Sequence, residues 1–168
     1  MNSEDGKTRS WKYGAMNMMT KPNCVAIPEA IERLASIAVD AAFAIHSELG
    51  PGLLESAYEA CFACEMQLRG INCQRQVAVP LTYKGGVIEV GFRADVLLEG
   101  KLLIELKAVE QLLPIHKAQL ITYLKLTGLP LGLLINFNEV LVKDGIRRVL
   151  NFHKNQNAKH QNANPKNL

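Results

Sequence analysis

Apolar residues recur at helical spacing in two adjacent segments of the first half of the chain. With a proline near its first turn, the first pattern predicts a helix over residues 28–49. Gly50-Pro51-Gly52 breaks the pattern, and a second helix is predicted from about residue 53 to residue 68, with Gly70 as its C-terminal cap. The residues that carry the first pattern are Ile31, Leu34, Ile37, Ala38, Ala41, Ala42 and Ile45.

The spacing becomes that of strands between residues 72 and 107. Three strands are predicted, one around residues 77–81, one over 87–98 and one over 102–106. Lys84-Gly85-Gly86 and Glu99-Gly100 are the predicted turns between them, because glycine reaches positive φ at little cost.

Helical spacing returns after Pro114 and predicts a helix that ends at Gly128 and Pro130. Residues 131–137 then form a buried strand, and residues 140–150 are compatible with a short β ribbon around Asp144-Gly145. The resulting order α-α-β-β-β-α-β predicts an α/β fold, in which a mixed sheet is flanked by helices.

Composition predicts one domain with two tails. A chain of 168 residues that is 48% hydrophobic can bury one core, which we expect within residues 28–152. Residues 1–27 have no helical or strand period and are expected to form a flexible arm, in which Met16, Met18 and Met19 are alternative starts to Met1. The tail of residues 153–168 is rich in Asn, Gln and Lys and is expected to be disordered.

The formal net charge of +3 does not come from the predicted domain. Residues 28–150 hold 12 basic and 14 acidic side chains, while the end of the chain after Asn151 adds three lysines and no acid. A protein that binds nucleic acid by charge alone usually has a basic face. Any contact with phosphate would therefore need a bound cation or a few placed residues.

The chain shows no pattern of a signal peptide or a membrane span, so we expect no membrane partner and a cytoplasmic location. Without a secretory signal its cysteines are expected to be free thiols. Cys61 and Cys64 form a lone CxxC without a second pair at zinc-ligand spacing, and we interpret them as small hydrophobes. The other two cysteines are Cys24 and Cys73.

Charged residues interrupt two of the apolar strands. Glu105 and Lys107 are two apart, so their side chains leave the same face, and Asp95 interrupts the preceding strand. Buried charges need pairing, water or a metal. If Asp95 lies beside Glu105, the repulsion between the carboxylates favours a hard cation such as Mg²⁺, and Lys107 could hold the attacking water or the scissile phosphate. The alternative is a salt-bridged pair on a partly exposed sheet edge.

The length of the turn between these two strands decides whether the site can form. A two-residue loop at Glu99-Gly100 would pair Asp95 with Ile104 and put Asp95 and Glu105 on opposite faces. A three-residue connection, or a glycine bulge at Gly100, would pair Asp95 with Glu105. The metal hypothesis predicts the second register.

Polar residues also share faces of the helices. Glu55, Tyr58 and Glu59 lie on one face of the second helix, although the helix dipole alone would favour a carboxylate at Glu55. His46, before the Gly50-Pro51-Gly52 corner, could face the site or be a structural histidine. A polar face of the later helix, which could merely bind loops, contains His116, Gln119 and Tyr123.

Ordered motifs between about residues 31 and 150 resemble those of the GxxExxY protein family. The signature itself is Gly52-Leu-Leu-Glu55-Ser-Ala-Tyr58. The other matching stretches are His46-Ser-Glu-Leu-Gly-Pro-Gly52, Arg93-Ala-Asp95, Ile104-Glu-Leu-Lys-Ala108, Gln119-Leu-Ile-Thr-Tyr-Leu124 and Gly132-Leu-Leu-Ile-Asn-Phe137.

This resemblance implies the PD-(D/E)XK nuclease superfamily, whose restriction-endonuclease-like core cuts nucleic acids with Mg²⁺, for which Mn²⁺ could substitute. By position, Asp95 and Glu105 would bind the metal, and Glu105 and Lys107 would be the (D/E)XK pair. Glu55 would be the helix carboxylate of the site and a further candidate metal ligand. Arg93-Ala94 stands where the superfamily name has proline, a common departure.

The resemblance also implies residues that support the site. Gln119 and Tyr123 resemble the QxxxY motif of the exonuclease-like branch of the superfamily and would position the nucleic-acid strand or Lys107. Tyr58 and His46 lie within the matching motifs and are expected to play supporting roles.

Two functions follow from these residues. The first is a Mg²⁺-dependent nuclease that hydrolyses phosphodiester bonds in DNA or RNA. The second is a non-catalytic module that binds nucleic acid or protein, which the lack of a basic face favours. The intact carboxylates and lysine on apolar strands favour the first, because a module without catalysis has little physical reason to keep them.

Overall fold

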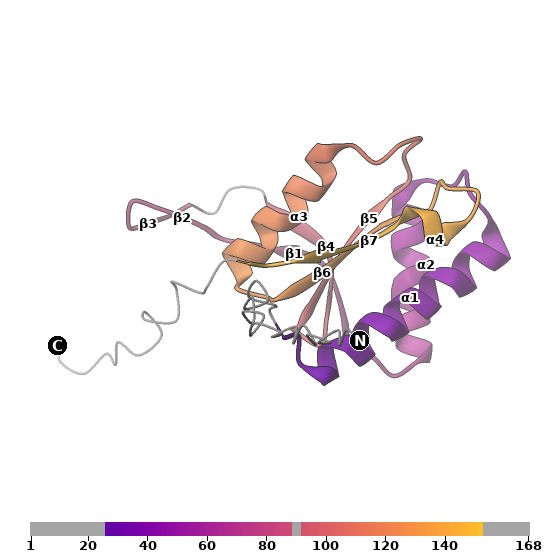
Figure 1. The fold of residues 1–168 in the computed structure, drawn as a ribbon, viewed down its shortest axis with the longest axis horizontal. Helices are drawn as coiled ribbons and strands as arrows, with labels where there is room; N and C mark the ends of the chain where they lie inside the picture. Colours follow the sequence, from indigo (N-terminus) through magenta and orange to yellow (C-terminus); the bar gives the residue numbers. More distant parts are fainter. Residues whose placement is uncertain (1–25, 89–91, 153–168) are drawn as a thin grey trace, which may run out of the picture.

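The computed structural model describes residues 26–88 and 92–152 (Figure 1). The expected tail and nearly all of the expected N-terminal arm lie outside these residues, and the domain limits at residues 28 and 152 stay a prediction. The helices are α1 (Glu29–Leu49), α2 (Glu55–Leu68), α3 (Pro114–Thr127) and the short α4 (Val142–Gly145). The strands are β1 (Cys73–Ala78), β2 (Leu81–Tyr83), β3 (Gly86–Ile88), β4 (Arg93–Leu98), β5 (Leu102–Lys107), β6 (Leu131–Asn136) and β7 (Ile146–Leu150).

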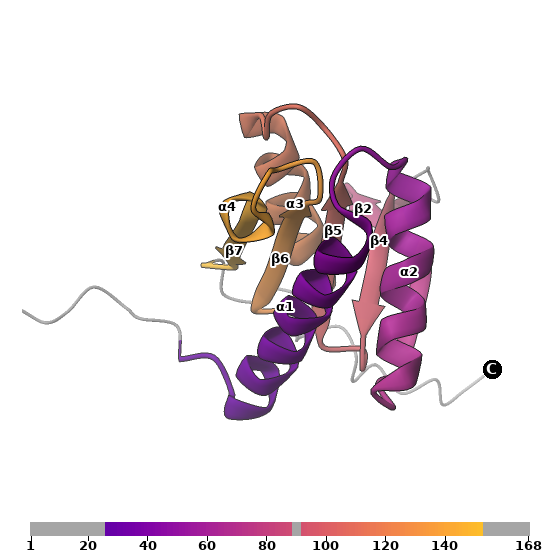
Figure 2. The same ribbon diagram turned by 90° about the vertical axis from the view of Figure 1, so that its right-hand side faces the viewer.

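Five strands form the main sheet in the order β1-β4-β5-β6-β7. All neighbours are antiparallel except β5 and β6, which are parallel and joined through α3. Helices α1 and α2 cover one face of the sheet and α3 covers the other (Figures 1 and 2). The predicted mixed α/β sheet with flanking helices is confirmed. Within the described residues, no helix combines the length and apolar character needed to cross a membrane.

The sheet separates two apolar clusters. Val96, Ile104 and Leu106 pack with α1 and α2 in the larger cluster. Leu103 packs with residues of α3, including Leu120, in the smaller one. Because successive residues of a strand point to opposite faces, the position of Glu105 between Ile104 and Leu106 assigns it to the face that α3 covers.

The prediction of a single strand over residues 87–98 was wrong, as was the extension of the preceding strand to Leu81. β2 and β3 form a separate two-stranded ribbon, which projects beyond α3 in Figure 1. Pro80 has no N–H to donate to a ladder, so β1 ends before it. The predicted turn at Lys84 and Gly85 then closes the ribbon on itself, with φ values of 48° and 84°.

The expectation of a short β ribbon around Asp144-Gly145 was also wrong. Residues 142–145 form α4, and β7 pairs antiparallel with β6 in the main sheet. Every residue of β6 is buried, so its main-chain groups need protein partners on both sides. β5 supplies one side and β7 supplies the other.

Gly145 provides a stability prediction, because a Cβ there would lie 2.3 Å from the main-chain oxygen of Asn136. Backbone cannot move aside as a flexible side chain can, so Gly145→Ala should lower the free energy of unfolding by about 1–3 kcal/mol. Gly86→Ala is the control, because its Cβ would meet only an ordinary contact at 3.6 Å. Urea denaturation of both variants measures this, and equal stabilities would contradict the close contact.

Candidate active site

The β4–β5 hairpin has the register that the metal hypothesis requires. Its connection is the three-residue turn 99–101, and the last pair of its ladder joins Val96 to Ile104. Continuing this register by one residue places Asp95 opposite Glu105. Positive φ values of 50° at Glu99 and 63° at Gly100 shape the turn.

Asp95 leaves the ladder at the point where it would pair with Glu105. Its Oδ2 instead accepts a hydrogen bond of 2.8 Å from the backbone N–H of Leu106. In a regular antiparallel pair that N–H would donate to a main-chain carbonyl of β4. The two strands therefore separate here, and the carboxylate of Asp95 takes the place of a backbone acceptor between them.

Three carboxylates surround the ammonium of Lys107. Its Nζ lies 2.9 Å from Glu105 Oε1, 3.7 Å from Asp95 Oδ2 and 3.6 Å from Glu55 Oε1. It also donates to the backbone oxygen of Leu106 over 2.8 Å. The four charged side chains that were predicted from β4, β5 and α2 thus meet at one end of the sheet.

Glu105 is the most deeply buried member of this group, with only 1% of its surface exposed. Its Oε2 is buried and has no hydrogen-bond partner among the described residues. Burial, together with the negative charge of Asp95, raises the pKa of Glu105 to about 7, although Lys107 opposes the shift. The carboxyl can therefore hold a proton near neutral pH.

The pKa values of the other two buried groups are raised as well. Burial raises that of Asp95, and the bond from Leu106 and the charge of Lys107 only partly offset it. For Lys107, burial alone would lower the pKa, but the hydrogen bond and charge of Glu105 and the charges of Asp95 and Glu55 outweigh it. Lys107 is therefore a stable cation in this arrangement.

Glu55 is the first residue of α2, which begins later than predicted. Leu53 and Leu54 were expected in the helix, but α2 starts at Glu55. The hydroxyl of Tyr58 donates to Gly50 O over 2.6 Å and accepts from Leu53 N over 3.2 Å. These bonds hold the 50–54 loop that delivers Glu55.

The ring of Tyr58 is held in place by a second aromatic side chain. It stacks on Phe137 with ring centroids 4.4 Å apart and is fully buried. Tyr58 therefore joins the loop that carries Glu55 to the core, and its supporting role in the site stays a prediction.

His46, Gln119 and Tyr123 make their hydrogen bonds away from the four charged residues. His46 Nε2 lies 2.8 Å from Glu139 O and ties the end of α1 to the segment after β6. Gln119 Nε2 donates to the hydroxyl of Tyr123 over 2.9 Å on α3. In the described parts of the chain, no ion pair or hydrogen bond joins these residues to Lys107, so their predicted roles in the site stay predictions.

Asn136 is a site neighbour that the sequence reasoning did not single out. It is fully buried and pairs with Lys107 in the β5–β6 ladder. Its side chain accepts from Val109 N over 3.0 Å and donates to Val109 O over 2.8 Å. It thereby fixes the chain just after Lys107. A lone asparagine in the apolar run 131–137 was the signal that could have found it.

The donor set fits a hard cation, although no group of three or more metal-ligating side chains is arranged as a finished metal site within residues 26–88 and 92–152. The carboxylates of Glu55, Asp95 and Glu105 offer the oxygen ligands that Mg²⁺ prefers. Oε2 of Glu105 has no hydrogen-bond partner in the described part of the chain, so no competing bond would oppose its use as a ligand. The ammonium of Lys107 now occupies the space between the carboxylates.

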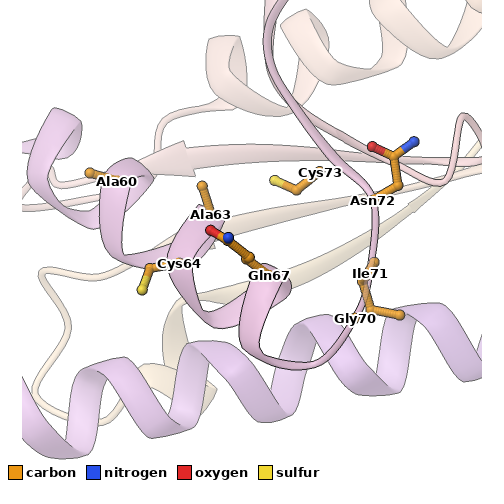
Figure 3. A pocket seen from close by; sticks show the side chains of 8 residues that line it. All are labelled: Ala60, Ala63, Cys64, Gln67, Gly70, Ile71, Asn72 and Cys73. Atoms are coloured by element: carbon orange, nitrogen blue, oxygen red, sulfur yellow. The ribbon is translucent and has the colours of Figure 1, made fainter.

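A pocket of about 650 Å³ lies elsewhere, beside the C-terminal half of α2 (Figure 3). It is bounded by α2 and by the connection 70–73. No charged side chain lines it, so it offers none of the groups that the charged cluster provides. Its lining residues are Ala60, Ala63, Cys64, Gln67, Gly70, Ile71, Asn72 and Cys73.

Comparison with known proteins identifies a superfamily. Residues 32–149 match the sequence model of the PD-(D/E)XK nuclease superfamily. No curated protein and no protein of solved structure matches the chain significantly. The matched range contains all four charged residues of the cluster.

The raised pKa of Glu105 predicts that stability depends on pH. The native carboxyl keeps its proton up to about pH 7, whereas the unfolded one ionises near 4.5. The native state is thus favoured below pH 4.5, and this stability is lost as the pH rises to 7. At about 1.4 kcal/mol per pH unit, the loss is on the order of 3 kcal/mol.

Glu105→Gln cannot titrate, so its free energy of unfolding should fall less than that of the wild type over this window. Denaturant unfolding at several pH values measures the difference, with Glu110→Gln at an exposed position as the control. Parallel profiles for wild type and Glu105→Gln would contradict the raised pKa.

Proposed function

The chain belongs to the PD-(D/E)XK nuclease superfamily, and we propose that it is a metal-dependent nuclease that hydrolyses phosphodiester bonds in DNA or RNA. Membership suggests nuclease activity, and the mixed sheet with its flanking helices is consistent with a restriction-endonuclease-like fold. The observation that carries the proposal is the convergence of three carboxylates from α2, β4 and β5 on the ammonium of Lys107.

Asp95 and Glu105 would hold the metal, and Glu55 would complete the set of oxygen ligands. The proposed metal is Mg²⁺, for which Mn²⁺ could substitute. A bound divalent cation supplies positive charge to the phosphate and lowers the pKa of a bound water. Glu105 must give up its proton to act as a ligand, so binding should release protons near neutral pH.

Lys107 would orient the attacking water or stabilise the charge that develops on the phosphate. Its hydrogen bond to Leu106 O holds the ammonium at the end of β5, beside the three carboxylates. Gln119 and Tyr123 would position the nucleic-acid strand or Lys107 from α3. The Gly52, Glu55 and Tyr58 signature further supports assignment to the GxxExxY proteins within the superfamily.

Nucleic acid is the proposed substrate, even though the domain is slightly acidic. A bound cation and Lys107 would provide the positive charge locally, in place of a basic face. We also propose a cytoplasmic location, with which free thiols at Cys61, Cys64 and Cys73 are compatible.

Metal binding should be visible as a gain in stability. A cation that binds only the native carboxylates contributes about 2.7 kcal/mol at 100 times its Kd. Mg²⁺ or Mn²⁺ should therefore raise the melting temperature of the wild type, and Asp95→Asn should abolish the rise. Asp40→Asn, which makes the same change at an exposed position of α1, should keep it. An equal rise in wild type and Asp95→Asn would place the ions elsewhere.

Nuclease activity should depend on Lys107 more than metal binding does. Loss of a single electrostatic stabiliser typically costs on the order of a hundredfold or more in rate. Lys107→Ala should therefore stay folded, keep the metal-induced rise in melting temperature and lose cleavage. Lys101→Ala removes the same charge at the exposed turn of this hairpin and should cleave normally.

The assay uses purified protein with Mg²⁺ or Mn²⁺ and with single- and double-stranded DNA and RNA. Absence of metal-dependent cleavage of every substrate by the wild type, together with comparable nucleic-acid binding by wild type and Lys107→Ala, would refute the enzyme. A non-catalytic binding module would then take its place.

A further inference from the structure

Two consecutive residues of β1 bind the same carboxylate on α2. Arg75 Nε donates to Glu59 Oε1 and Gln76 Nε2 donates to Glu59 Oε2, each over 2.7 Å. Consecutive side chains of a regular strand point to opposite faces, so this double contact requires a break in the alternation. The break is at Gln76, whose φ of 51° is left-handed, a conformation that costs free energy in a residue other than glycine.

β4 breaks its alternation at the same level. The register places Gln76 opposite Asp95, but these two residues do not pair, although their neighbours on both sides do. Val96 packs in the cluster of α1 and α2, whereas Ala94 packs in the cluster of α3. Residues two apart in a regular strand share a face, so β4 turns over at Asp95 as β1 does at Gln76. The flanking pairs are Arg75 with Val96 and Val77 with Ala94.

We propose that Glu59 is a positioning residue, which acts through Gln76 on Asp95. Its bond to the amide of Gln76 holds β1 in the left-handed conformation and so prevents a continuous β1–β4 ladder. Asp95 then stays turned toward β5, where its carboxylate reaches the backbone N–H of Leu106 and the ammonium of Lys107. The functional part of this inference rests on the proposed nuclease, whereas the geometric part does not.

The simpler alternative is that Glu59, which is 7% exposed, only pairs with Arg75 to neutralise a buried charge. In that case the conformation of Gln76 would have no effect on Asp95. Gln76 variants therefore separate the two explanations. Glycine adopts left-handed φ freely, whereas β-branched valine favours a regular strand.

The backbone amide of Leu106 reports where Asp95 lies, because it donates to the Asp95 carboxylate. Its NMR chemical shift and hydrogen-exchange rate are measured in the full chain, with Asp95→Ala as the reference for a lost bond. We expect Gln76→Val to move both toward that reference and Gln76→Gly to stay close to wild type. Glu59→Gln removes the charge that binds Arg75 and Gln76 with little change in side-chain shape. It should also move the shift and the exchange rate toward the reference.

Glu65→Gln is the matched control, because it makes the same substitution on α2 at a residue that pairs with Arg69, the residue just after this helix. It should leave the Leu106 amide unchanged. If Gln76→Val fails to fold, Glu59→Gln against Glu65→Gln still decides the question. A Leu106 amide that stays at its wild-type shift and exchange rate in Glu59→Gln overturns the proposal.

Loss of a residue that orients a ligand typically costs about 10- to 100-fold in metal affinity or activity. We expect that loss in Glu59→Gln and Gln76→Val, both in Mn²⁺ affinity and in cleavage, with Gln76→Gly close to wild type. If the Leu106 amide responds as expected while the wild type cleaves no nucleic acid, the positioning role stands and the proposed nuclease fails. The two proposals therefore fail separately.

Discussion

Three carboxylates share a single lysine ammonium at one end of the sheet, and the rest of the site is arranged around this imbalance. Removing charge from water is costly unless an opposite charge compensates it. Glu55, half exposed, keeps access to water, whereas Glu105 does not. The pKa of about 7 at Glu105 reduces the repulsion among the carboxylates, because a proton on Glu105 removes one negative charge. A divalent cation would reduce the same repulsion, and a proton and the metal should therefore compete for Glu105.

The charged residues are kept close together by side chains that hydrogen-bond to main-chain groups without a backbone partner. Where β4 separates from β5, the N–H of Leu106 would lack an acceptor, and Asp95 supplies one. On the far side of β5, Asn136 binds both main-chain polar groups of Val109. Tyr58 does the same for the loop before α2. Main-chain polar groups that are partly withdrawn from water are stabilised by such partners, so these polar side chains support the local backbone and also fix the charged residues.

The sequence predicted the parts of the site that depend on local pattern. Glu105 and Lys107 stand two apart in an apolar strand. Counting residues across the turn left two registers open, and the metal hypothesis predicted the one that brings Asp95 to them. The sequence did not predict the left-handed Gln76, because nothing local distinguishes this residue from its neighbours and the carboxylate that it binds lies on α2, far along the chain. The β2–β3 ribbon was missed because its apolar spacing is that of any strand, and α4 because its four residues carry no helical period.

The turn between β4 and β5 lies at the opposite end of the sheet from the site. All three of its residues are exposed, and exposed turns are where proteins usually tolerate insertions and deletions. Here a change of one residue in length would shift Asp95 relative to Glu105 by one position and reverse its direction. Substitutions that keep the turn conformation leave this relation intact. The turn is thus open to variation in chemistry but closed to variation in length, and a surface loop with no part in the reaction becomes a poor place for a tag or linker.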